Sequence, residues 1–179
     1  GFLSSDIKNA HSVTYFLKTV LKNYNQDEFE IILFINQIEE DNTSEEIANL
    51  ASKTINVGKL NDLEAFNIIR QHNLDVMIDI MGYTSRNRIE FYKNRIAKKQ
   101  VIWMGYCNTS GLKNMDYIIT DPNLVLKNEE KYYVEKILYL PEIWNCHCGF
   151  DFERKENLPP FIKNNYCLLY TSDAADEVQ

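Results

Sequence analysis

Short apolar runs alternate along this chain with stretches in which apolar residues recur at helical spacing. The apolar runs have the length and the β-branched and aromatic content of strands. They predict strands at residues 2–5, 29–35, 53–57, 76–81, 100–104, 117–120 and 137–140. Helical spacing predicts helices at residues 11–24, 42–51 and 61–72. This alternation is typical of an α/β fold, so we expect a Rossmann-like, mostly parallel sheet with helices on both faces.

Two segments carry the pattern most clearly. In residues 11–24, Val13, Leu17 and Leu21 fall on one stripe of a helix, as a face packed against a sheet requires. Residues 76–81 are almost continuously apolar. Such a run is typical of a central parallel strand that is buried on both faces, so we expect this strand at the middle of the sheet.

Composition and charge exclude several classes of protein. The chain has 179 residues, 45% of them hydrophobic and 25% charged, which is the balance of one globular domain. Its net charge is -7 and no dense Lys/Arg block occurs, so nucleic acid is disfavoured as a partner. No apolar run is long enough for a membrane span and no signal peptide is recognisable. The four Cys lack the spacing of a disulfide framework, which favours a cytoplasmic location.

The two ends suggest that this sequence is a piece of something longer. It begins without Met, in what reads as the body of a strand. Residues 167–179 resemble the translation of a transposase adapter, and we expect them not to belong to the natural protein. We therefore expect a Rossmann-like lobe at residues 1–141, the start of a connection at 142–166, and a non-native tail at 167–179.

Ligands of open α/β sheets bind beyond the carboxyl ends of the strands, so the segments that follow strands hold the candidate chemistry. After the first strand, His11 stands at a predicted helix start. The positive end of the helix dipole disfavours an imidazolium there and leaves a neutral ring that can accept a proton. A His that only caps the helix is the alternative.

A second candidate segment follows the strand at 76–81. Gly82 allows a ligand to approach the backbone, and the hydroxyls of Tyr83 and Thr84 add hydrogen-bonding groups. A plain turn between a strand and a helix would use the same residue types. Asp79 could serve as a base or position a ligand, or its carboxylate could bond the N–H groups of the turn.

The third candidate is the loop from Gly105 to Gly111, which is dense in small polar residues and could wrap a polar ligand. It matches neither a dinucleotide-binding G-x-G-x-x-G nor a P-loop. Cys107 within it could act as a nucleophile or fill space as a small apolar residue. Cys146, His147 and Cys148 lack the further ligands that a tetrahedral zinc site needs, so we expect no metal.

Taken together, segments 1–6, 11–17, 79–84, 102–111 and 115–121 resemble the catalytic region of the protein O-linked N-acetylglucosamine transferases and their Spindly-like and bacterial relatives. The resemblance implies the first lobe of a GT-B fold, two Rossmann-like lobes with a cleft between them. It implies inverting, metal-independent transfer of N-acetylglucosamine from UDP-GlcNAc to Ser or Thr hydroxyls of proteins, without a cofactor. The second lobe, which supplies a Lys and a Gly-His-Thr-Thr turn to the nucleotide, is missing here, so the isolated chain is expected to be inactive. Tetratricopeptide repeats commonly precede the lobe in this family.

The resemblance also assigns roles to residues. His11 matches a His discussed as a proton acceptor or a sugar-contacting residue, although the chain is one residue longer than usual between Asp6 and His11. Thr84, with Tyr83 beside it, matches the turn that lines the donor sugar. The third loop matches the turn against the N-acetyl sugar and the diphosphate, with the substrate-binding residues Gly105, Tyr106, Cys107, Thr109, Ser110 and Gly111. Cys107 and Asn108 replace the usual Pro-Gly, which bears on the choice of sugar.

Two alternatives stay open at this point. A flavodoxin-like or receiver-like binding or signalling domain shares the alternating pattern, although a receiver would carry an acidic pair after its first strand and a Lys after its fifth. Within the family, a relative that transfers fucose or glycosylates Asn is also compatible with the sequence, because those choices depend on the second lobe.

Overall fold

The computed structural model describes residues 1–149, 158 and 160–165. The chain divides into two compact units, residues 1–149 and residues 150–179. Within the second unit, the described part holds one short helix, α4 (Pro160–Asn164). The predicted tail at 167–179 lies outside the described residues, as do residues 150–157, 159 and 166 of the predicted connection, and the predicted domain division stays a prediction.

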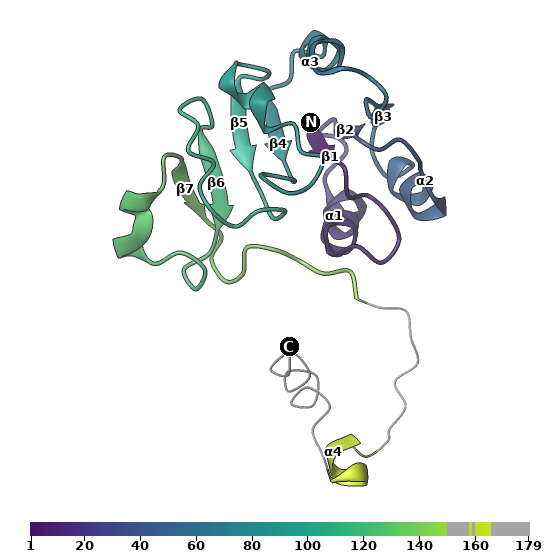
Figure 1. Ribbon diagram of the computed structural model, residues 1–179, viewed down its shortest axis with the longest axis vertical. Coiled ribbons are helices and arrows are strands. Elements are labelled where there is room, and N and C mark those ends of the chain that lie inside the picture. Colours follow the sequence, from purple (N-terminus) through teal and green to yellow (C-terminus); the bar gives the residue numbers. More distant parts are fainter. Residues whose placement is uncertain (150–157, 159, 166–179) are drawn as a thin grey trace, which may run out of the picture. The chain divides into compact units, whose positions relative to one another are not determined.

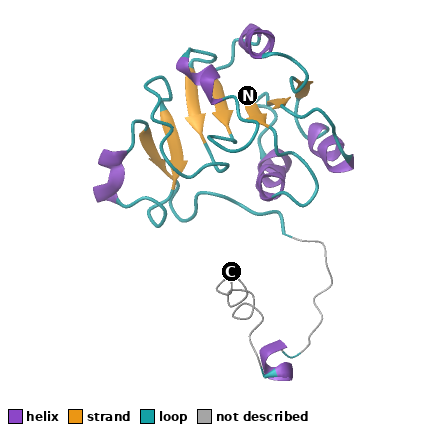
Figure 2. Ribbon diagram, in the orientation of Figure 1, coloured by secondary structure: helices purple, strands orange, loops and turns teal. Residues whose placement is uncertain are grey.

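The first unit is built on a seven-stranded sheet in which every pair of neighbours is parallel (Figures 1 and 2). The strand order is β3-β2-β1-β4-β5-β6-β7. The strands are β1 (Phe2–Ser4), β2 (Ile32–Ile35), β3 (Lys53–Asn56), β4 (Val76–Asp79), β5 (Lys99–Ile102), β6 (Tyr117–Thr120) and β7 (Lys136–Tyr139). From β1 the chain adds β2 and then β3 on one side of the sheet. It then adds β4 to β7 on the other side of β1, so the strand order reverses between β1 and β4.

Helices connect the strands, and the sequence explains where they begin. The α-helices are α1 (Ser12–Asn23), α2 (Asn42–Ala48) and α3 (Asp62–Gln71), and the 3-10 helices are η1 (Ile89–Lys93) and η2 (Lys127–Tyr132). Asp41 and Asn61 each form a capping box at the start of α2 and α3, and His11 caps α1. Such caps satisfy amide groups that the first helical turn leaves without partners.

Two apolar clusters lie on opposite faces of the sheet. Leu17 of α1 and Ile47 of α2 pack with Phe2 and Leu33 on one face. Residues of α3 and η1 pack with Leu3 on the other face. Because adjacent strand residues point to opposite faces, Phe2 and Leu3 enter different clusters. The predicted α/β architecture with helices on both faces is confirmed.

The predicted strands and helices are all present, and most of them are shorter than predicted. The predicted strand at 76–81 ends as β4 at Asp79, because the Asp79 carboxylate bonds the next turn. The predicted strand at 100–104 ends as β5 at Ile102, and Met104 lies in the left-handed region at φ 60°. Within the described residues, no helix is both long enough and apolar enough to cross a bilayer.

Candidate functional site

Three loops meet where the strand order reverses: those that follow β1, β4 and β5. Because β4 pairs with both β1 and β5 in parallel, the carboxyl ends of all three strands lie at one edge of the sheet. Ligands of open α/β sheets bind in the crevice at such a reversal. All three segments predicted to carry chemistry therefore lie together.

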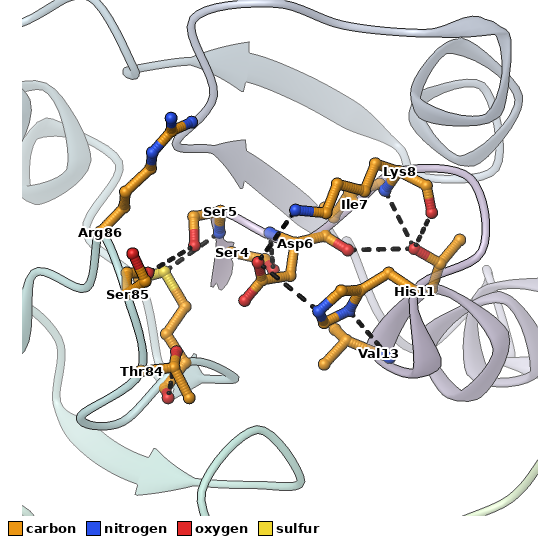
Figure 3. Close-up of polar contacts among 12 residues, drawn as sticks. Ser4, Ser5, Asp6, Ile7, Lys8, His11, Val13, Thr84, Ser85 and Arg86 are labelled. Atoms are coloured by element: carbon orange, nitrogen blue, oxygen red, sulfur yellow. Dashed lines mark hydrogen bonds and ion pairs between the residues drawn. The ribbon is translucent and has the colours of Figure 1, made fainter. Parts of the chain in front are cut away.

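The loop after β1 is tied to the turn after β4 (Figure 3). The Ser5 amide lies 3.0 Å from Met81 Sδ, and the Ser5 hydroxyl donates to the Ser85 carbonyl at 3.3 Å. Ser5 is buried, so its contact with Met81 is shielded from water, whereas its bond to Ser85 is partly buried. The two loops are thus held in a fixed relation across the reversal.

His11 adopts the position that the sequence predicts, at the start of α1 (Figure 3). Its Nδ1 accepts a hydrogen bond from the Val13 amide at 3.4 Å, and its Nε2 lies 3.7 Å from Asp6 Oδ1. An Nδ1 that accepts carries no proton, so a neutral ring holds its proton on Nε2. In this conformation His11 caps the helix and turns an N–H, rather than a lone pair, toward Asp6.

Asp79 is a buried carboxylate that shapes the turn after β4. It is 1% exposed and accepts hydrogen bonds from the amides of Gly82 at 2.9 Å and Met81 at 3.3 Å. Burial raises the pKa of Asp79 to about 7, although the two amide bonds favour the ionised form. Its contacts match the expected alternative, in which the carboxylate bonds the N–H groups of the turn.

Tyr83 and Thr84 differ in where their hydroxyls point. The Tyr83 hydroxyl donates to the Ser110 carbonyl at 2.6 Å, and its ring meets that of Tyr106 edge to face at 5.5 Å. Tyr83 therefore joins the turn after β4 to the loop after β5. The Thr84 hydroxyl donates to the Met81 carbonyl at 2.9 Å, which leaves its oxygen lone pairs for a ligand donor.

Gly82 and Gly105 are required by the close approach of the two loops. A Cβ on Gly105 would lie 1.9 Å from the Ile80 carbonyl oxygen, and one on Gly82 would lie 2.2 Å from the Tyr106 Cβ. Gly82 also has a positive φ of 57°. Neither position accommodates a side chain without movement of the backbone, so these glycines set the distance between the loops.

The loop after β5 is anchored by Glu135, a residue that the sequence analysis missed. Glu135 is 4% exposed and accepts from the Thr109 hydroxyl at 2.7 Å, the Ser110 amide at 2.8 Å and the Ser110 hydroxyl. The two hydroxyl protons are thus used within the protein. The hydroxyl oxygens also accept from backbone amides, Thr109 Oγ1 from Gly111 and Ser110 Oγ from Leu112, both at 3.1 Å, so these side chains shape the loop. Glu135 directly precedes β7. A carboxylate beside an apolar run was the signal in the sequence that could have pointed to this residue.

A second missed residue, Arg88, holds the end of the turn after β4. It donates to Asn36 Oδ1 at 2.8 Å and to the Val57 and Leu60 carbonyls at 3.0 and 2.8 Å. Asn36 in turn donates to the Arg86 carbonyl at 2.8 Å. The loops after β2 and β3 therefore brace the turn that carries Thr84.

Of the three described cysteines, Cys107 lies in a loop of the site, and Cys146 and Cys148 lie in residues 142–149. Cys107 is exposed in the loop after β5. In residues 142–149, His147 stacks on Tyr15 of α1 at 5.1 Å, and the Trp144 carbonyl accepts from Trp103 Nε1 at 2.7 Å. The described residues contain no group of three His, Cys, Asp or Glu side chains arranged to hold a metal ion.

Known proteins are similar to this chain in sequence and fold. Two plant proteins named "Probable UDP-N-acetylglucosamine--peptide N-acetylglucosaminyltransferase" are similar: SPINDLY of Solanum lycopersicum is 26% identical over 151 residues, and SEC of Arabidopsis thaliana is 28% identical over 159. The matches cover 82% and 87% of this chain. They cover 16% of each relative, so the chain spans a small part of their length.

A solved structure agrees with the sequence relatives. A mutant of the O-GlcNAc transferase of Thermobaculum terrenum superposes with a TM-score of 0.77 and 25% identity, over 81% of this chain and 28% of that protein. The model of the family described as glycosyl transferase family 41 matches residues 1–150. That match includes all three loops of the site, and on it the chain belongs to glycosyl transferase family 41.

Proposed function

We propose that this chain is the first lobe of a GT-B glycosyltransferase that moves N-acetylglucosamine from UDP-GlcNAc to Ser or Thr hydroxyls of proteins, with inversion and without a metal. The family match and the relatives' names support a UDP-sugar donor and a protein acceptor. The observation that carries the proposal is the junction of the turn after β4 and the loop after β5 through Tyr83 and Ser110. It forms a polar wall beside the strand-order reversal between β1 and β4, where α/β sheets bind ligands.

In this proposal the wall binds the donor sugar. Thr84 accepts from a sugar hydroxyl, since its own proton is bonded to Met81. Exposed parts of the loop from Gly105 to Gly111, with Tyr106, contact the N-acetyl group and the diphosphate. Cys107 lies in this loop and bears on the choice of sugar. Asp79 and Glu135 act as positioning residues, because their carboxylates bond the backbone of the two segments.

His11 contacts the substrates rather than serving as the base in the conformation described here. Its Nδ1 is bonded to Val13, so Nε2 holds the proton and donates. For His11 to take a proton at Nε2, the proton must move to Nδ1 and the bond to Val13 must break. The acceptor hydroxyl therefore passes its proton elsewhere, or the cap of α1 opens during the reaction.

The remaining partners of the reaction belong to the part of the protein beyond this chain. A leaving diphosphate needs preorganised charge, which is commonly the largest catalytic contribution. We propose that a second lobe supplies it and that the isolated chain is inactive and binds UDP weakly. Tetratricopeptide repeats ahead of the lobe and a cytoplasmic location are part of the same proposal. Transfer of fucose or glycosylation of Asn is the alternative within the family.

A chimera tests this function. Residues 1–149 replace the matching segment of the Thermobaculum terrenum O-GlcNAc transferase, with its mutated residue restored. The chimera is incubated with UDP-GlcNAc and either a Ser-containing peptide or its Ala analogue. Intact-mass spectrometry should detect N-acetylhexosamine on the Ser peptide alone. A folded chimera that binds UDP but leaves the Ser peptide unmodified would contradict the proposal. The alternatives within the family are separated by the full-length protein with its own second lobe, supplied with UDP-GlcNAc or GDP-fucose and with Ser or Asn peptides.

A further inference from the structure

Tyr92 places a hydroxyl in the apolar core beneath the site. It lies in η1, has no exposed surface, and belongs to the cluster that packs on the α3 face of the sheet. Within the described residues its hydroxyl has no hydrogen-bond partner. An unpaired buried hydroxyl costs free energy that a Phe at the same place would avoid, so a Tyr here points to a polar neighbour.

That neighbour is the buried carboxylate of Asp79. In the register of the sheet, Asp79 pairs with Leu3 on one side and with Ile102 on the other. Paired residues of neighbouring strands point to the same face, so the Asp79 side chain enters the cluster that holds Leu3, Ile102 and Tyr92. Burial and, after it, the Asp79 carboxylate raise the pKa of Tyr92 well above its usual value, so the hydroxyl keeps its proton.

The Asp79 carboxylate can accept more hydrogen bonds than it receives. Its oxygens accept from the amides of Met81 at 3.3 Å and Gly82 at 2.9 Å. An ionised carboxylate offers about four acceptor positions, so these two amides leave some of them open. A further donor from the core would stabilise the ionised form.

In the described part of the chain, the elements packed around this carboxylate bring uncharged side chains to the cluster. Leu3 of β1, Ile102 of β5 and Ile69 of α3 are apolar. The amide of Gln100, on the same face of β5, already donates to two backbone carbonyls. The Tyr92 hydroxyl of η1 is therefore the donor that the core offers to the carboxylate.

We propose that Tyr92 is a positioning residue for the sugar site: when Asp79 is ionised, the Tyr92 hydroxyl turns to donate to its carboxylate and fixes it beneath the turn that carries Thr84. The inference rests on the proposed function, which makes that turn part of the sugar site. A hydrogen bond to an ionised group is about twice as strong as one to a neutral group, so the hydroxyl favours the ionised form. Loss of the hydroxyl should therefore raise the pH at which Asp79 ionises.

Carbon-13 NMR of the complete 179-residue chain tests the pair. The chain is labelled at its Asp carboxyl carbons and titrated without sugar nucleotide from about pH 4 to about pH 9. The signal that disappears in Asp79→Asn belongs to Asp79. Tyr92→Phe removes only the hydroxyl and should move the midpoint of this signal upward by about one pH unit, the effect of one hydrogen bond to a charged group. Tyr132→Phe is the matched control, because Tyr132 is 68% exposed, and it should leave the midpoint unchanged.

Hydrogen exchange at the Gly82 amide measures whether the pair acts on the turn. In Tyr92→Phe the protection of this amide should fall roughly two- to tenfold at about pH 8, the range expected for one hydrogen bond. It should stay near the wild-type value at about pH 5, where Asp79 holds its proton. An unmoved Asp79 midpoint, or an equal loss of protection at both pH values, would overturn the proposal and leave Tyr92 a packing residue.

The chimera that carries residues 1–149 connects the pair to the reaction. The pH profile of kcat/KM for GlcNAc transfer should move upward by about one pH unit in Tyr92→Phe and should stay in place in Tyr132→Phe. A profile that stays in place while the Asp79 midpoint moves would overturn the positioning role. A chimera that transfers no sugar contradicts the proposed function instead, and it leaves the midpoint and the exchange readable.

Discussion

Replacement of Asp79 by Asn should make the stability of the chain less dependent on pH. Asp79 is the buried carboxylate beneath the turn of the site, and burial raises its pKa from 3.8 to about 7. Between these two values the folded chain holds a proton that the unfolded chain has lost. The folded state binds more protons, so the free energy of unfolding falls as pH rises through this window.

The shift sets the size of the effect. A difference of about three pKa units lowers the free energy of unfolding by about 4 kcal/mol above pH 7. Roughly 1.5 kcal/mol of that loss is already present near pH 5. In the Asp79→Asn variant the side-chain amide has one oxygen for two backbone donors, so the variant loses one hydrogen bond, worth about 1 kcal/mol. This loss is the same at every pH. As the pH rises from 5 to 8, the free energy of unfolding of the variant should therefore increase by about 2 to 3 kcal/mol relative to that of the wild type.

Urea unfolding followed by the fluorescence of buried Trp103 measures this difference. The amino group of Gly1 titrates in the same range, because burial lowers its pKa from 8.0 to about 5, and it acts in the opposite sense. Subtracting the wild-type curve from the variant curve at each pH removes that contribution. A difference that stays constant from pH 5 to pH 8 would refute the assignment of a buried, protonatable Asp79.

Substitutions at Glu135 and Gly105, with Gly111→Ala as the control for Gly105, test how the loops are held. Glu135→Gln offers one oxygen to the three donors of Thr109 and Ser110. We therefore expect the free energy of unfolding to fall by about 1 to 3 kcal/mol and the Ser110 amide to exchange its hydrogen faster. Unchanged exchange would show that Glu135 does not anchor the loop. Gly105→Ala places a Cβ against the Ile80 carbonyl and should lower the free energy of unfolding by about 3 kcal/mol or more. The Cβ of Gly111→Ala meets no neighbouring atom. This variant should lose only about 1 kcal/mol, because the positive φ of Gly111 disfavours a side chain. Equal melting temperatures of the two Ala variants would contradict the close approach at Gly105.

The fold was predictable because the hydrophobic pattern and the helix-capping residues of the sequence indicate the same elements. Apolar runs of strand length alternate with amphipathic stretches, and Asp41 and Asn61 supply the helix caps. The residues at which strands and helices end were harder to predict from the sequence. β4 stops at Asp79 because its side chain bonds the following amides, and hydrophobic periodicity carries no trace of such a bond.

The site was predictable as a set of loops but not as a set of contacts. The rule that ligands bind beyond strand ends leads to the segments of His11, Thr84 and Gly105. Glu135 and Arg88 were missed because their partners lie 25 to 52 positions away in sequence and come together only through strand order. The sequence shows a carboxylate beside an apolar run at Glu135, but it does not show which distant residues that carboxylate contacts.

The most direct measurement is the rate of GlcNAc transfer by the chimera that carries residues 1–149. The account predicts transfer to a Ser peptide, a loss of about tenfold or more in kcat/KM for Thr84→Val, and no loss for Lys136→Glu. The wall formed by the loops after β4 and β5 would then be part of the sugar site. A folded chimera that binds UDP but transfers nothing, or a Thr84→Val variant with the wild-type rate, would contradict the claim that this lobe holds the donor sugar.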